Sequence, residues 1–265
     1  NVNISDDRGF EISALYQQNI GKFKIDIAPN FSFGKEKFLV RKDIEVFTDS
    51  DYLRISGREG EWVNRRFGYI SDGIFLSQDE INNHQTIQDG NGNLLLRPGD
   101  IKYKDLDGND TINFRDQDVI GFASNMPEMT YGMNLSASYK NFKLSMLLQG
   151  ASKFSIYIDG PAAKMFNNGS TPLSYQYKYA WQPHPDDPSI NINPDAQLPA
   201  ASFSSNTNNS KISDFWLRDV RYLRLKNVNL TYSIPKKILS KLRIFSAQFY
   251  VSSENILTFT NLGMY

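Results

Sequence analysis

The stretch at residues 222–234 restricts the possible folds of this chain more than any other. From Val228 onward its even positions are apolar, and the neighbouring odd positions hold small polar side chains: Asn227, Asn229, Thr231 and Ser233. A period of two is typical of a β-strand, because successive side chains point to opposite faces. Such a strand suits a wall between lipid and a watery lumen. It equally suits a soluble sheet with one wet face.

The same alternation recurs along the chain. It predicts six strands, near residues 9–18, 22–34, 130–139, 142–150, 220–234 and 245–256. Each is about ten residues long, which is the length that a tilted strand needs to cross a bilayer. The sequence therefore predicts an all-β fold.

The connections between these strands are unequal. Three are short, at 19–21, 140–141 and 235–243, and two are very long, at 35–129 and 151–219. Compact soluble domains rarely carry structureless loops beyond roughly 15 residues, whereas outer-membrane barrels combine short periplasmic turns with long outer loops. The pattern favours part of a transmembrane antiparallel β-barrel over a soluble β-sandwich, with 35–129 and 151–219 as extracellular surface loops.

Composition excludes several classes of function. The 29 Lys and Arg balance 29 Asp and Glu, so the chain has no electrostatic footprint for nucleic acid. The absence of cysteine excludes disulfides and thiol catalysis. No apolar run is long enough for a membrane-spanning helix, and no signal peptide opens the chain. We expect an internal fragment, whose barrel would close only with the missing chain.

An acidic segment in the first long connection matches much of an EF-hand calcium loop. The candidate metal ligands at loop positions 1, 3, 5, 7 and 12 are Asp105, Asp107, Asn109, Thr111 (through its carbonyl) and Asp116. Position 6 should be glycine but is Asp110, which argues for weak affinity. The alternative is a turn stabilised by its own side-chain hydrogen bonds. In either case the segment would stiffen a loop. We therefore expect no required cofactor, and the one candidate for a bound ion is Ca²⁺ at 105–116.

The sequence predicts no enzyme. Its two histidines, His84 and His184, stand alone in polar loops, and no nucleophile elbow, Walker loop or zinc signature is present. The long loops are rich in aromatic residues, whose flat rings beside Asn, Asp and Gln can stack on sugars. The alternative is that these rings pack the loops against each other. The candidate ligand-binding residues are Trp62, Tyr69, Tyr177 and Trp181.

Several segments, in the same order and with similar gaps, resemble one family. They include YLRLKNVNLTYSIPKK at 222–237, FYVSSENILTFT at 249–260, FGYISDGIFLSQDEI at 67–81, PGDIKYKDLDG at 98–108, and YGMNL with YKNFKL within 131–144. They resemble the penultimate part of the SusC/RagA family of TonB-linked outer-membrane proteins of Bacteroidota. The resemblance covers nearly the whole chain. Asp110 departs from it, because the family usually has glycine there.

The resemblance implies a barrel of about 22 strands in the outer membrane, filled by an N-terminal plug that contacts TonB. Such proteins import bulky nutrients, mostly oligosaccharides and sometimes peptides, beneath a SusD-like surface lipoprotein that acts as a lid. Residues 1–265 would be a C-terminal section of this barrel, without the plug and the closing strands.

The competing hypothesis is a soluble, calcium-stiffened carbohydrate-binding β-sandwich module. The two hypotheses differ in what covers the apolar face of the strands. A sandwich must bury that face in a core, whereas a barrel can leave it to lipid. The residues concerned are Met133, Leu135, Leu144, Met146, Leu148, Val228, Leu230 and Tyr232.

Overall fold

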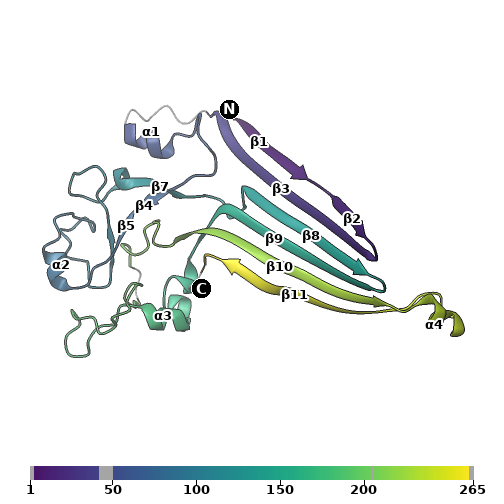
Figure 1. The fold of residues 1–265 in the computed structure, drawn as a ribbon. Coiled ribbons are helices and arrows are strands. Elements are labelled where there is room, and N and C mark those ends of the chain that lie inside the picture. Colours follow the sequence, from purple (N-terminus) through teal and green to yellow (C-terminus); the bar gives the residue numbers. More distant parts are fainter. Residues whose placement is uncertain (1–2, 42–49, 204–205, 263–265) are drawn as a thin grey trace.

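The computed structural model describes residues 3–41, 50–203 and 206–262. One antiparallel sheet dominates it, in the order β1-β3-β8-β9-β10-β11, with β2 also paired to β3 (Figure 1). The strands are β1 (Ile4–Ser13), β2 (Tyr16–Ile20), β3 (Phe23–Val40), β8 (Met129–Tyr139), β9 (Phe142–Tyr157), β10 (Leu217–Ser233) and β11 (Gln248–Thr260).

All six predicted ranges overlap these strands, but their predicted lengths are wrong. β3, β9 and β10 have 18, 16 and 17 residues, whereas the predicted ranges 22–34, 142–150 and 220–234 are shorter. The first predicted strand divides into β1 and β2, and the last begins at Gln248 rather than at 245. β3 continues through Lys35, Glu36 and Lys37 while it stays paired to β1. Charged residues there carry no apolar alternation, so the sequence pattern stops before the strand does.

The short connections all lie at one end of the sheet, as predicted. Figure 1 shows the β2–β3 turn, the β8–β9 turn and the β10–β11 connection, which contains α4 (Lys236–Lys241), at the same ends of their strands. Both long connections lie at the opposite end. Within the described residues, no helix is long and apolar enough to cross a membrane.

One face of the sheet is apolar across all its strands. Residues paired directly across antiparallel strands lie on the same face, and the register aligns Ile27 with Leu135 and Leu135 with Met146. The row then continues from Met146 to Val228. Many side chains on this face are exposed, including Leu230 and Val251. Among the described residues, no second sheet packs on this face, as a sandwich would require.

The opposite face is polar and cross-linked by side chains. Gln17 Nε2 donates to the Asp26 carboxylate at 2.8 Å, and Ser136 Oγ donates to the same carboxylate at 3.0 Å. Farther along the sheet, Arg224 Nε donates to Thr258 Oγ1 at 3.1 Å. The two faces therefore require different surroundings.

The two long connections fold together into one lobe rather than two structureless loops. The lobe contains two small sheets, β4–β7 and β5–β6. Its core joins residues from both connections, including Ile101, Trp181 and Trp216. Its elements are α1 (Ser50–Ser56), β4 (Arg66–Tyr69), β5 (Ser71–Ile74), α2 (Gln78–Asn82), β6 (Ile101–Tyr103), β7 (Gln117–Gly121) and α3 (Ser174–Tyr179).

Buried amides tie the two connections to each other. Gln88 Nε2 donates to the Ile101 carbonyl and to Asn208 Oδ1, and Asn208 Nδ2 donates to the same carbonyl. Both side chains are buried. Asp100 is buried beside them and accepts from Asn206 and Asn209 at 2.7 and 2.9 Å. Burial raises the pKa of the Asp100 carboxyl, although these donors oppose the rise.

Candidate functional site

Aromatic side chains form a continuous row across the apolar face near the short turns. The register pairs Phe23 with Tyr139, Tyr139 with Phe142, Phe142 with Tyr232, and Tyr232 with Phe249. The Phe23 and Tyr139 rings stack with centroids 4.3 Å apart, and those of Phe142 and Tyr232 lie 4.7 Å apart. The row crosses five strands that are far apart in the sequence.

A second aromatic row lies eight residues farther along β3 and β8. It contains Phe31, Tyr131 and Phe259, which the register joins through Gly150 and Leu223. The Tyr131 ring covers Gly150, and its hydroxyl donates to the Tyr222 carbonyl at 2.9 Å. Eight residues at about 3.4 Å each separate the rows by about 27 Å along a strand.

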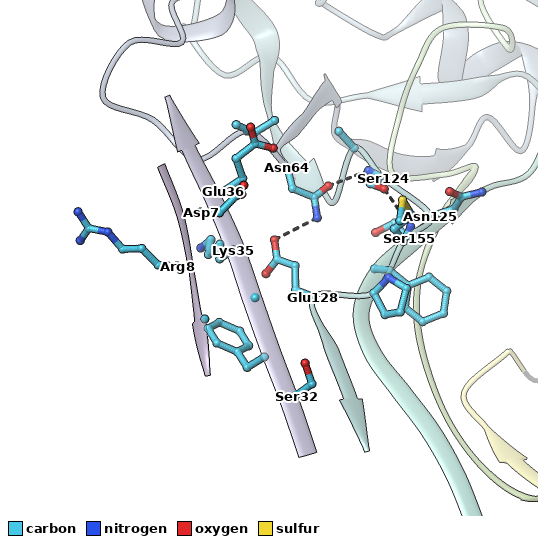
Figure 2. A pocket seen from close by; sticks show the side chains of 18 of the residues that line it. Asp7, Arg8, Ser32, Lys35, Glu36, Asn64, Ser124, Asn125, Glu128 and Ser155 are labelled. Atoms are coloured by element: carbon cyan, nitrogen blue, oxygen red, sulfur yellow. Dashed lines mark hydrogen bonds between the residues drawn. The ribbon is translucent and has the colours of Figure 1, made fainter. Parts of the chain in front are cut away.

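A hollow with a volume of about 1530 Å³ lies where the sheet meets the lobe. Figure 2 shows side chains from β1, β3 and the 123–128 segment around it. Its lining includes a polar set on one face of β1 and β3, Asp7, Glu11, Ser32 and Glu36, together with Glu128 just before β8. The hollow therefore combines carboxylates with the cations of neighbouring segments.

Asn64 and Arg66 connect this hollow to the lobe. Asn64 Nδ2 donates to Glu128 at 3.0 Å, and Asn64 Oδ1 accepts from the Ser124 N–H at 2.7 Å (Figure 2). Arg66 Nη2 donates to the Ala123 carbonyl at 3.0 Å. Arg66 also lines the hollow, so its guanidinium stands beside the carboxylates there.

The acidic loop brings three predicted ligands together. One ligand oxygen each from Asp105, Asp107 and Asp116 lie within 4.8 Å of one another. Asp110 adopts the left-handed conformation that position 6 demands, with φ at 59°. Ile112 is buried beneath the loop in the lobe core. The backbone therefore has several features of a cation-binding loop despite the missing glycine.

The same loop is also held by its own hydrogen bonds. Asp105 accepts from the N–H groups of Gly108 and Asp110 at 2.8 and 2.7 Å. Asp116 is fully buried and accepts from Leu106 and Asn113. Desolvation acts to raise the pKa of the Asp105 carboxyl, but these backbone donors hold it below its ordinary value.

The other two predicted ligands make similar local contacts. Asn109 Oδ1 accepts from the Thr111 N–H at 2.9 Å, and the Thr111 carbonyl accepts from Asn113 Nδ2 at 3.0 Å. A carbonyl oxygen has two lone pairs, so these contacts and a cation are compatible. The geometry of the loop is therefore compatible with a bound cation and also with a turn that is held by its own side-chain hydrogen bonds.

The four candidate ligand-binding aromatics do not form one site. Lys35 Nζ lies 4.0 Å from the ring centroid of Trp62, beside the end of β3. Tyr69 packs against Tyr103 in the lobe core. Trp181 is only 3% exposed, whereas Tyr177 is 74% exposed. Packing accounts for Tyr69 and Trp181, and Tyr177 is the ring most open to a ligand.

Sequence reasoning did not identify Asn64, Arg66 and Glu128 as residues of the hollow. It also did not predict that the aromatic residues align in rows across the strands. The individual rings were visible in the alternating segments. Their alignment follows from the strand register, and that register requires knowledge of the short turns.

Comparisons with known proteins identify relatives of the whole chain. No protein-family model matches it. TonB-dependent receptor P3 of Formosa agariphila is 28% identical over 270 residues, which cover 98% of this chain and 25% of that receptor. TonB-dependent receptor P26 of the same organism is 26% identical over 234 residues, covering 87% of this chain and 20% of the receptor. The chain thus spans about a quarter of the length of these relatives.

The fold is also similar to part of larger chains in solved structures. A chain of the RagAB peptide transporter structure aligns with a TM-score of 0.65 and 19% identity, covering 98% of this chain and 26% of that chain. The open-open state of the RagAB peptide importer gives a TM-score of 0.60 at 17% identity. The curated relatives are receptors rather than enzymes, in agreement with the sequence prediction. The predicted resemblance is confirmed, and the chain is a relative of the TonB-dependent receptors.

Proposed function

We propose that residues 1–265 form part of the wall and the outer loops of a TonB-dependent outer-membrane importer of bulky nutrients. The observation that carries the proposal is the apolar face between its two aromatic rows. Outer-membrane barrels carry an outward apolar band about 25 Å tall, bordered by aromatic girdles. Strands tilted by about 40° would convert the 27 Å between the rows into about 21 Å along the membrane normal.

The residues between the rows support this assignment. On β8 and β9 the face between them holds Met133, Leu135, Ala137, Leu144, Met146 and Leu148, none of which is charged. The opposite face carries the Asp26 and Arg224 contacts and would face the water-filled interior. A partial barrel wall explains both faces. The soluble sandwich leaves the apolar face without a partner layer among the described residues.

The lobe and the hollow then belong to the outer opening of the barrel. The hollow, with Glu36, Glu128 and Arg66, would face the interior where cargo passes. RagAB is a peptide transporter, and the family resemblance also allows oligosaccharides. A SusD-like lipoprotein would cover the opening, and TonB would act through a plug outside this chain.

The acidic loop and the aromatic rings have supporting roles in this proposal. Ca²⁺ bound by Asp105, Asp107, Asn109, Thr111 and Asp116 would brace the lobe where a lid docks. Of the four candidate aromatic residues, Tyr177 would contact ligand, whereas Tyr69 and Trp181 would stabilise the lobe core.

Fractionation and uptake test the proposal with the full-length receptor. We expect the protein in the outer membrane, resistant to extraction by high salt and released by detergent. Cells should take up labelled oligosaccharide or peptide only when this receptor and TonB are both present. Recovery of the protein in the soluble fraction would refute the barrel assignment. Uptake independent of TonB would refute the transport mechanism.

A further inference from the structure

The short-turn end of the sheet is strongly basic, although the whole chain has no net charge. Segments 19–24, 139–143 and 233–248 contain no Asp or Glu. The cations at the turns themselves are Lys22, Lys140, Lys236, Lys237, Lys241 and Arg243, and all six are exposed. Within the described part of the chain, no carboxylate pairs with them. The opposite end of the sheet, by contrast, mixes both signs of charge around the hollow.

These cations lie immediately beyond the first aromatic row. Lys140 directly follows Tyr139 of that row, and its Nζ lies 5.2 Å from the Tyr139 ring centroid. Lys236 comes four residues after Tyr232, and Arg243 comes six residues before Phe249. Lysine and arginine can extend their charged ends to the headgroup level while their stems remain on apolar surface. The charges therefore stand where an aromatic girdle places the membrane surface.

The β10–β11 connection adds exposed apolar side chains to these charges. In Figure 1, α4 projects beyond the other two short turns. Leu239 is buried and anchors the turn, whereas Ile238, Leu242, Ile244 and Phe245 are 52%, 63%, 46% and 98% exposed. Phe245 is the most exposed of the large hydrophobic side chains in the described part. Cations beside exposed apolar groups are typical of segments that lie in a membrane interface.

Two of the three short connections are also tied to each other by hydrogen bonds. The Ser233 N–H donates to the Asn141 carbonyl at 2.9 Å, and Asn141 Nδ2 donates to the Ser233 carbonyl at 2.7 Å. These bonds join the β8–β9 turn to the end of β10. Lys140 and the cations of the α4 connection are consequently held at the same edge.

We propose that this basic edge binds the headgroups of anionic phospholipids in the periplasmic leaflet, with Phe245 and its apolar neighbours inserted beside them. The inference rests on the barrel assignment, which places the short turns on the periplasmic side. Charge complementarity favours phosphate groups, and the position beside the aromatic row favours a membrane over a soluble polyanion. Each cation near an anionic surface adds a favourable contribution, so the six together can distinguish anionic from zwitterionic lipid.

Native mass spectrometry of the detergent-purified full-length receptor tests the proposal. The receptor is incubated with phosphatidylglycerol or with phosphatidylcholine of the same acyl chains, and the bound lipids are counted. We expect preference for phosphatidylglycerol by about tenfold or more. A turn variant with Lys236→Gln, Lys237→Gln, Lys241→Gln and Arg243→Gln should lose most of this preference.

The lobe offers a matched control of three lysines and one arginine. Lys104→Gln, Lys164→Gln, Lys178→Gln and Arg97→Gln remove the same charge from exposed positions far from the short turns. This variant should retain the wild-type preference. Equal loss in the two variants would show that net charge alone governs binding, and would overturn the proposal.

Two further measurements separate the possible failures. If the turn variant does not fold, the wild-type receptor still tests the proposal. Its preference for phosphatidylglycerol must disappear at about 1 M salt, where the screening length is about 3 Å. A preference that persists there would overturn the electrostatic mechanism. Membrane fractionation and uptake report on the proposed function independently. A receptor that imports nutrient but binds both lipids equally would refute only the lipid site.

Discussion

Replacing Leu135 with arginine tests whether the apolar face meets lipid. Leu135 lies four residues from Tyr139 and four from Tyr131, midway between the two aromatic rows. At about 3.4 Å per residue and a tilt of about 40°, each row is about 10 Å away along the membrane normal. Its cross-strand neighbours Ile27 and Met146 offer no partner for a guanidinium. We expect the free energy of unfolding to fall by about 2–4 kcal/mol, the cost of arginine near the bilayer centre.

Two further arginine variants make this experiment specific. Leu230 lies on the same face but only two residues from Tyr232, so Leu230→Arg should cost less, on the order of 1 kcal/mol. Asn134 lies on the polar face, where arginine should cost below about 0.5 kcal/mol. Denaturant unfolding of the full-length receptor in phospholipid vesicles measures all three. Equal losses for Leu135→Arg and Asn134→Arg would refute the lipid-facing assignment, and a larger loss at Leu230 would refute the assigned depth.

Four other predictions follow from the same structure. Protease added to intact cells should cut within 35–129 or 151–219, and cleavage confined to the short turns would invert the proposed topology. Asp105→Ala should increase the protease sensitivity of the acidic loop, because its carboxylate accepts two backbone N–H groups; unchanged digestion in this variant and after chelation would leave the segment an ordinary turn. Burial, assisted by a nearby lysine, lowers the pKa of His84. The folded lobe therefore binds fewer protons than the unfolded chain, so its stability should fall as the pH falls below about 6.5. In thermal melts, the His84→Phe variant should lack this sensitivity to acid. Gly150→Val should lower the free energy of unfolding by about 1–3 kcal/mol, because its side chain would overlap a neighbouring tyrosine ring; an unaltered denaturation midpoint would contradict this packing.

The sheet was largely predictable because its strands have two chemically different faces. Leu144 and Met146 against Ser145 show the period of two without any knowledge of tertiary structure. The ends of the strands were less predictable. Lys35 and Glu36 remain in β3 through backbone pairing, which does not depend on the identity of the side chain. Apolar periodicity therefore identifies the part of a strand that has one face against lipid or a core. It does not identify the part that is exposed to water on both faces.

The lobe was not predictable by the same reasoning. Its core combines Ile101 with Trp181 and Trp216, which are separated by long stretches without periodicity. Gln88 and Asn208 are buried, although such residues usually lie at the surface. Only the folded arrangement shows that they satisfy each other and the Ile101 carbonyl. The acidic loop was easier to find, because its ligands are close in sequence.

The lobe is joined to the large sheet by two paired strands that extend beyond the second aromatic row. β9 continues from Gly150, at the second aromatic row, to Tyr157, and β10 begins at Leu217, before it reaches that row. In this shared extension, Ala151, Phe154 and Val220 form a small buried cluster of their own. A lobe carried on paired strands resists bending more than one carried on flexible single-chain linkers. Any displacement of the lobe relative to the sheet must then either tilt these strands or break the hydrogen bond from the Ile158 N–H to the Trp216 carbonyl at the base of the lobe.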